Sequence, residues 1–411
     1  MMQTKKIHWV SLLTLVVFGF GLLIFLAAFA FMSVSSIVHL IAGIGAPAAE
    51  MIGAFAFGFH ILLLLVCAWF VFQKTRGAEQ SEAPLRIPFA WSQVVGTIAV
   101  PAVSVFIGGI VTLAEIEWLG WLFLPLLTLL VVVPPIWLYF GAGSHGLEAG
   151  SRWRFFAVFG LSMTAAPFIM ILLEMVFLLL GIFVAAVYLA VNQPLLFAEI
   201  TKLTDVILEE TDLEVILQLV SPYIANPAVL AAGFGYLAIL VPVIEELFKP
   251  LAVWLFAKQI GSPAQGFVLG MASGAAFGLL ESLNASADGS TGWAVVVAAR
   301  AGTSLLHIVT SGLVGWGIVS AFKEKRIGRF AAAFFASVLI HGVWNAAAAG
   351  AGIVAVGESI GKPEWLYNYA PAMLCGLLTM GIGIFAVLLA SNRRLKTQTV
   401  QPEEEKVEST S

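Results

Sequence analysis

Long apolar runs recur along the whole chain and constrain its fold more than any other feature. A run of about 20 such residues is long enough for an α-helix to cross a bilayer. The chain of 411 residues is 60% hydrophobic and 11% charged, and no soluble domain of this size can bury so much apolar surface. The sequence therefore predicts an all-α, polytopic transmembrane helical bundle. Its ten predicted spans are 8–32, 51–73, 89–113, 118–141, 162–191, 229–257, 264–285, 293–321, 329–351 and 368–391.

The number and direction of the spans depend on the fifth apolar run. Pro167 interrupts this run between Phe155 and Val191, which predicts either one tilted helix or two short ones. With ten spans, most lysines and arginines outside the spans fall on one side of the membrane. The positive-inside rule makes that side cytoplasmic, so both termini are predicted to be cytoplasmic. An eleventh span would destroy this asymmetry.

The predicted spans divide the chain into five parts. An N-terminal transmembrane region of five spans (1–192) carries no recognised motif. The acidic, amphipathic segment that follows (193–227) is predicted on the outer face, either as a connector lying on the membrane or as a lid that docks substrate. A four-helix transmembrane core (228–351) is the predicted catalytic region, and the last loop and span follow (352–391). The polar tail (392–411) is predicted to be disordered.

The sixth span contains the segment VPVIEELFKPLAVW. Glu245, Glu246 and Lys249 lie inside it, and ionisable groups at this depth are costly and usually line a functional cavity. Spacings of three and four residues bring Lys249 to both glutamates on one helix face. A carboxylate beside a like charge has a raised pKa, which suits general acid or base catalysis. Pro242 and Pro250 each remove a backbone donor, which predicts an irregular, wet helix. A purely structural Glu–Lys pair is the alternative.

Three later spans add further polar groups. Glycines recur every fourth residue of the seventh span, at positions 266, 270, 274 and 278, which predicts close helix packing that carries Glu281 into the bundle. His307 lies near the middle of the eighth span. Arg300, two turns earlier, is predicted to pair with Glu281, and Ser304 is a candidate for fixing the histidine tautomer, unless it bonds back to its own helix. In the ninth span His341 and Asn345 share one face.

These residue types fit two kinds of hydrolytic site. The histidines and one carboxylate, His307, His341 and Glu281, suit a Zn²⁺ site in which a second carboxylate activates water. A metal-free site is equally compatible, with a glutamate as base and a histidine stabilising the oxyanion. The three aspartates lie outside the predicted spans, and no histidine is followed by glutamate. These absences exclude an intramembrane aspartyl dyad and an HExxH zinc motif.

Four segments in order, EELFK, GAAFGLLES with Glu281, the region of His307, and HGVWN, resemble the PrsW family of intramembrane proteases. That family belongs with the CAAX prenyl-protease and bacteriocin-processing superfamily. The resemblance covers about residues 235–350. The chain has EExxK where the CAAX branch has EExxxR, and it lacks that branch's FxxxH, which favours the PrsW branch. The resemblance implies that Glu245 and Glu246 hold the catalytic base and that Glu281, His307 and His341 complete the site.

We therefore expect an intramembrane endopeptidase, a multi-pass protein of a bacterial cytoplasmic membrane. The resemblance implies that it cuts a membrane-anchored protein in or near its transmembrane segment. An anti-sigma factor or a similar signalling regulator, cut in a site-1-type step, would be such a substrate. The expected partners are that substrate and the lipid bilayer, and no nucleic acid is expected. Two alternatives remain: a proton- or ion-coupled transporter that uses the buried Glu, His and Lys side chains, and an inactive scaffold that binds membrane segments.

Overall fold

The chain folds almost entirely into α-helices. Within the part of the chain that the structure describes, ten helices are long and apolar enough to cross a membrane, by length and composition. The predicted all-α, ten-span class is therefore confirmed. The computed structural model describes residues 8–210, 213–224, 226–286, 289–290, 292–355 and 368–408.

The spans lie close to the predicted ranges. α1 continues well past the predicted end at residue 32, to Ala42, and the left-handed conformation of Gly43 (φ 66°) ends the helix. The fifth span begins at Arg152, ahead of the predicted residue 162, and α16 extends past the predicted residue 391. The spanning segments are α1 (Trp9–Ala42), α2 (Pro47–Thr75), η2 (Trp91–Gln93) with α3 (Val94–Leu113), α4 (Glu117–Ser144), α5 (Arg152–Met163) with α6 (Ala165–Asn192), α9 (Pro227–Gly235) with η3 (Tyr236–Leu240), α10 (Val241–Phe248) and α11 (Leu251–Phe256), α12 (Pro263–Ala285), α13 (Trp293–Glu324), α14 (Ile327–Ala355) and α16 (Ala370–Glu408).

The fifth span is one long crossing that contains a break. α5 ends at Met163 and α6 begins at Ala165, with Thr164 between them at φ −120° and ψ −78°. The cause is Pro167, which has no N–H for the carbonyl of Met163 and whose ring clashes with it. Both interpretations of this run thus hold in part, and the count of ten is unchanged.

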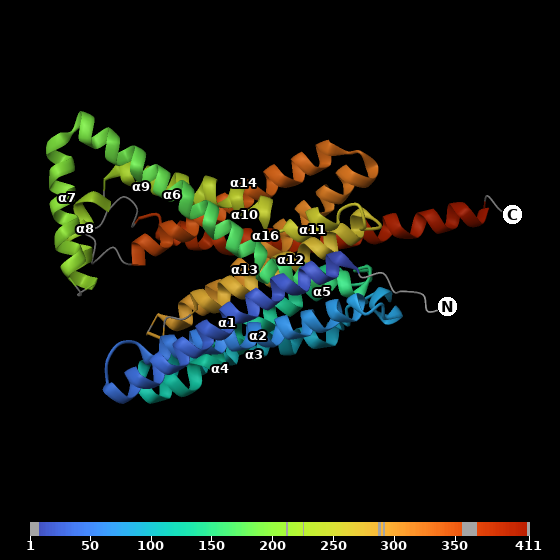
Figure 1. The fold of residues 1–411 in the computed structure, drawn as a ribbon, viewed down its shortest axis with the longest axis horizontal. Helices are drawn as coiled ribbons and strands as arrows, with labels where there is room; N and C mark the ends of the chain where they lie inside the picture. Colours follow the sequence, from blue (N-terminus) through green and yellow to red (C-terminus); the bar gives the residue numbers. More distant parts are fainter. Residues whose placement is uncertain are drawn as a thin grey trace. The chain divides into compact units, whose positions relative to one another are not determined.

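The chain divides into two compact units, which are described separately. The first unit comprises Met1–Pro167, Glu246–Ser337 and Gly383–Ser411, and the second comprises Phe168–Glu245 and Val338–Ile382. In the first unit α1 packs along α2, α3 along α4, and α12 along α13 (Figure 1). Helices of the N-terminal region therefore belong to the same unit as α12 and α13.

The glycines of α12 allow its backbone to touch that of α13. A Cβ atom added to Gly270 would lie 2.2 Å from the carbonyl oxygen of Ser311, and one on Gly274 would lie 2.1 Å from that of His307. No side chain fits at such distances, so the stripe is a packing surface, as predicted. This backbone contact fixes the position of His307 along the length of α12.

Side chains from α4 and α5 fix the position of α12 and α13. The indole of Trp293, fully buried at the start of α13, donates to Thr128 of α4 at 3.0 Å. Ser162 of α5 and Ser273 of α12 are bonded through their hydroxyls at 2.8 Å. These polar contacts are buried, where an unmade hydrogen bond is costly, so they hold the helices in one register.

The acidic segment of the second unit contains two helices, α7 (Pro194–Glu209) and α8 (Leu213–Ile224). They lie next to each other beyond the end of α6 (Figure 1), and the hydroxyl of Tyr223 donates to Glu199 at 2.7 Å. The segment thus has a helical structure of its own between two spans.

The C-terminal tail differs from its prediction. α16 runs through the last span to Glu408, so residues 392–408 are helical where the sequence predicted disorder; residues 409–411 lie outside the described part. Adding a residue to an existing helix costs far less than starting a helix. The tail also begins with good helix formers such as arginine, leucine and lysine, so the span extends into it.

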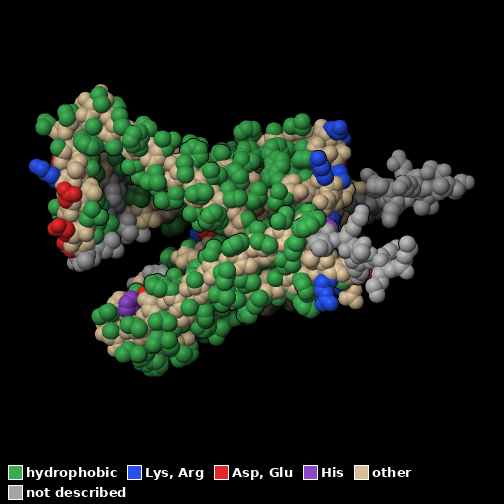
Figure 2. Space-filling view, in the orientation of Figure 1, with side chains coloured by type: hydrophobic (Ala, Val, Ile, Leu, Met, Phe, Trp, Pro, Cys, Tyr) green, Lys and Arg blue, Asp and Glu red, His purple; other side chains and the backbone are tan. Residues whose placement is uncertain are grey.

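The visible surface is mostly apolar. Figure 2 shows hydrophobic side chains over most of the face in view, and many large ones on α1, α3 and α6 are exposed, such as Phe31, Val95 and Val191. Water-soluble monomers rarely expose such continuous apolar area. The surface is therefore the one expected of helices that face lipid.

Candidate active site in α10, α12 and α13

The helix that carries the two glutamates is irregular, as Pro242 and Pro250 predict. A π-helical turn, η3, precedes Pro242, and the helix is interrupted at Lys249 and Pro250. Protein side chains supply donors to the backbone here. The hydroxyl of Ser273 donates to the carbonyl of Lys249, and the indole of Trp254 donates to that of Leu247 at 3.2 Å. The carbonyls of Lys249 and Leu247 are therefore satisfied by protein donors.

Glu246 and Lys249 form a fully buried ion pair. The Lys249 Nζ atom lies 2.6 Å from Oε1 of Glu246, and neither side chain is exposed. The same oxygen lies 3.0 Å from the hydroxyl of Thr310 on α13, which also lies 3.0 Å from its own helix at the carbonyl of Leu306. Removing one partner of such a pair leaves an uncompensated buried charge, so each side chain requires the other.

His307 extends this pair toward α12. Its Nδ1 atom lies 3.0 Å from Nζ of Lys249, and its Nε2 atom lies 2.5 Å from Oε2 of Glu281. A lysine ammonium can only donate, so Nδ1 accepts and Nε2 carries the proton that it donates to Glu281. The contacts thus define one tautomer, with the Nδ1 lone pair directed at a cation.

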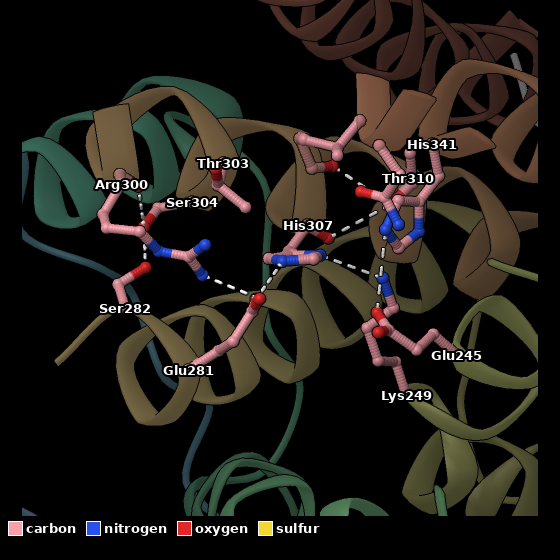
Figure 3. Close-up of polar contacts among 12 residues, drawn as sticks. Glu245, Lys249, Glu281, Ser282, Arg300, Thr303, Ser304, His307, Thr310 and His341 are labelled. Carbon is pink, nitrogen blue, oxygen red and sulfur yellow. Dashed lines mark hydrogen bonds and ion pairs between the residues drawn. The ribbon is translucent and has the colours of Figure 1, made fainter. Parts of the chain in front are cut away.

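Glu281 also binds Arg300, as predicted. The guanidinium of Arg300 lies 2.8 Å from Oε1 of Glu281, while Oε2 binds His307 (Figure 3). One carboxylate oxygen therefore faces the guanidinium, and the other accepts from the imidazole. The continuous chain of contacts runs Glu246, Lys249, His307, Glu281, Arg300.

The formal charges in this chain of contacts balance. Two carboxylates face one ammonium and one guanidinium, and His307 is neutral in the tautomer that its partners define. A buried set of ions is tolerated when opposite charges are paired and hydrogen bonded. The neutral sum explains how five ionisable side chains can lie within an apolar bundle.

Of the two predicted alternatives for Ser304, the structure shows the bond back to its own helix. Its hydroxyl donates to the carbonyl of Arg300 at 2.9 Å and lies 3.0 Å from the hydroxyl of Ser282. It thus bonds back along its own helix and across to α12, as serine in helices often does. The tautomer of His307 is set by Glu281 and Lys249.

In the second unit, Glu245 and His341 lie together. Oε2 of Glu245 is 3.8 Å from Nε2 of His341, and both side chains are largely buried. Asn345, one turn after His341, donates at 3.1 Å to the carbonyl of Leu237, which lies within the π-helical turn. Asn345 therefore satisfies the backbone that this turn leaves open.

Some residues of the site could not be identified from the sequence. Phe277 places its ring at right angles to that of His307, with centroids 5.0 Å apart, and the Lys249 ammonium lies 5.4 Å from its centroid. Ser273 donates to the backbone carbonyl of Lys249, and Thr310 donates to the carboxylate of Glu246. Small polar or aromatic residues in an apolar span look like packing residues. Only Thr310 could have been suspected from the sequence, because it follows His307 by three residues and so lies on a neighbouring face of the same helix.

Comparison with known families agrees with the motifs. The model of the PrsW family intramembrane metalloprotease matches residues 152–376, more than half of the chain and a wider region than the expected 235–350. No curated protein and no solved structure matches the chain. The family match supports the expected peptidase in preference to the two alternatives, a transporter and an inactive scaffold. The chain therefore belongs to the PrsW family of intramembrane metalloproteases and is an intramembrane peptidase.

Proposed function

We propose that this peptidase cuts a membrane-anchored protein in or near its transmembrane segment with Glu245, Glu246, Glu281, His307 and His341. The observation that carries the proposal is the continuous chain of contacts from Glu246 through His307 to Arg300, in which Glu246, Lys249 and His307 are buried. Ionisable groups buried at membrane depth and held in defined tautomers are the kind of set that performs acid–base chemistry.

We further propose that the metal implied by the family is Zn²⁺ and that His307, His341 and Glu245 bind it. The donor types fit zinc, which prefers two or three nitrogens with a carboxylate. Histidines that bind metals usually donate their other N–H to a carboxylate, as His307 does to Glu281. Bound Zn²⁺ would polarise the scissile carbonyl and lower the pKa of a water molecule.

Connectivity along the helices supports this ligand set. Glu245 directly precedes Glu246 on α10, so the two carboxylates are anchored one residue apart. Ser337 of α14 donates to the carbonyl of Thr310 at 3.2 Å, and His341 follows Ser337 by four residues, about one helical turn. Glu281 was a candidate ligand. Since its two oxygens already face the guanidinium of Arg300 and the imidazole of His307, we propose that it orients His307.

Glu246 is the proposed general base. Its carboxylate is fully buried and lies beside Lys249 and Thr310, so it is shielded from bulk solvent. A carboxylate in such surroundings can take a proton from water as the peptide bond is attacked and return it to the leaving amine.

The proposed substrate rests on the family resemblance, and the proposed orientation of the protein in the membrane rests on its charge distribution. We propose an anti-sigma factor or a similar signalling regulator, cut in a bacterial cytoplasmic membrane by a protein with both termini in the cytoplasm. Vesicles that hold purified protein and a membrane-anchored test substrate provide the experiment. Cleavage that a His307→Ala variant lacks supports the proposal. Intact substrate in all vesicles would refute it.

Replacement of Glu281 by glutamine should lower metal affinity by about 10–100-fold, the usual effect of removing a carboxylate behind a metal-binding histidine. Competition with a chromophoric chelator measures the change. Ser282→Ala is the matched control, because Ser282 is adjacent on α12 and contacts Ser304 instead of His307. Equal losses in both variants would show a general loosening of α12.

A further inference from the structure

Lys249 places a positive charge where a metal ion would bind. Its ammonium lies 2.6 Å from the carboxylate of Glu246 and 3.0 Å from the Nδ1 lone pair of His307. These are a carboxylate oxygen and an imidazole nitrogen, the two donor types that bind zinc at about 2.0–2.2 Å. The face of Phe277 also lies beside the ammonium and attracts cations.

The ammonium and a metal ion cannot both use this position. A metal on Nδ1 of His307 needs the lone pair that Lys249 now occupies, because Nε2 carries a proton bound to Glu281. Two cations within a few ångströms in an apolar site would also repel each other strongly. The fully buried Lys249 is anchored at its own carbonyl by Ser273, so only its flexible side chain is able to move away.

We propose that Lys249 is a resident cation which a divalent metal must displace in order to bind, so that the lysine keeps the metal-free site closed. In the closed state Lys249 holds Glu246 and His307 in an inert ion pair. Displacement of the ammonium releases the carboxylate and the Nδ1 lone pair together. Metal binding and assembly of the proposed base are thereby one event. This inference rests on the proposed metal site at His307.

Only molecules in which Lys249 has moved away can bind the metal. The apparent metal affinity is then the intrinsic affinity multiplied by the fraction of such molecules. Lys249→Met removes the charge but keeps the length of the side chain. It should bind Zn²⁺ at least about tenfold more tightly than wild type, measured on the purified full chain by competition with a chromophoric chelator. Lys249→Arg keeps a cation and should bind no more tightly than wild type. Lys323→Met removes an exposed lysine and should have no effect.

Folded Lys249→Met protein with equal or weaker Zn²⁺ affinity would overturn the inference, even if His307→Ala lowers the affinity as the proposed site requires. If His307→Ala binds Zn²⁺ as tightly as wild type, the proposed metal site fails and the inference with it. The two failures are therefore distinguishable.

Wild-type protein gives a second test that needs no altered site, in case Lys249→Met does not fold. A membrane-permeant amine reagent, read by mass spectrometry, reports how accessible each lysine is. Zn²⁺ should raise the labelling of Lys249 several-fold and leave that of Lys323 unchanged. Labelling of Lys249 that stays constant or falls would contradict displacement.

Discussion

Replacement of Glu246 by glutamine is expected to lower kcat for a reconstituted membrane-anchored substrate by about 10²–10⁴-fold, the usual contribution of a general base. The glutamine keeps the shape of the side chain but cannot accept a proton. Metal content should remain, because we assign metal binding to Glu245, His307 and His341. Cleavage rates and metal stoichiometry of the same preparation measure both effects.

The buried ion pair complicates this variant, and a second one separates the effects. Glu246→Gln leaves the Lys249 ammonium without its carboxylate, which costs about 3–5 kcal/mol of folding free energy. The double variant with Lys249→Met removes the unpaired charge and should regain thermal stability. If Glu246 is the base, the double variant stays inactive. Recovery of cleavage along with stability would show that Glu246 is only structural.

Gly274→Ala should damage both stability and activity, although it adds a single methyl group. The new Cβ would lie 2.1 Å from the carbonyl oxygen of His307, and a helix backbone cannot move aside as a side chain can. Overpacking of this kind costs about 1–3 kcal/mol. A shift of about 1 Å in a reacting group lowers activity by about 10²-fold. Thermal unfolding in detergent and cleavage rates measure the two effects.

Gly278→Ala is the matched control in the same stripe. Its Cβ would have its nearest neighbour, the Cα of Ser304, at 3.5 Å, which is ordinary van der Waals contact. Alanine is also the better helix former, by about 0.5–1 kcal/mol. We expect unchanged activity and equal or higher stability. Similar damage in both variants would mean that the contact with His307 has no special importance.

The sequence was sufficient for the parts of the fold that depend on one helix at a time. Span positions follow from the length of the apolar runs, and Pro242 and Pro250 predict the irregular helix around the glutamates. The pairing of Arg300 with Glu281 was also predictable, because both lie toward the same end of their spans. Each of these inferences needs only helix geometry and the cost of burying charge.

Other contacts across helices were not predictable in the same way. Ser304 has the right spacing to bond His307, yet its hydroxyl binds its own backbone and Ser282. The contact between Lys249 and His307 joins residues 58 positions apart, and their spacing within one helix carries no information on it. The extension of α16 into the tail depends on propagation from a folded span, which composition alone does not reveal.

If His307 and His341 hold a metal for peptide hydrolysis, as we propose, the metal content of purified protein will depend on both histidines. Wild type should hold about one zinc-type ion per chain, and the double variant His307→Ala with His341→Ala should lose it while remaining folded. Equal metal content in both proteins would contradict the account, as would wild type that cleaves its substrate without any bound metal.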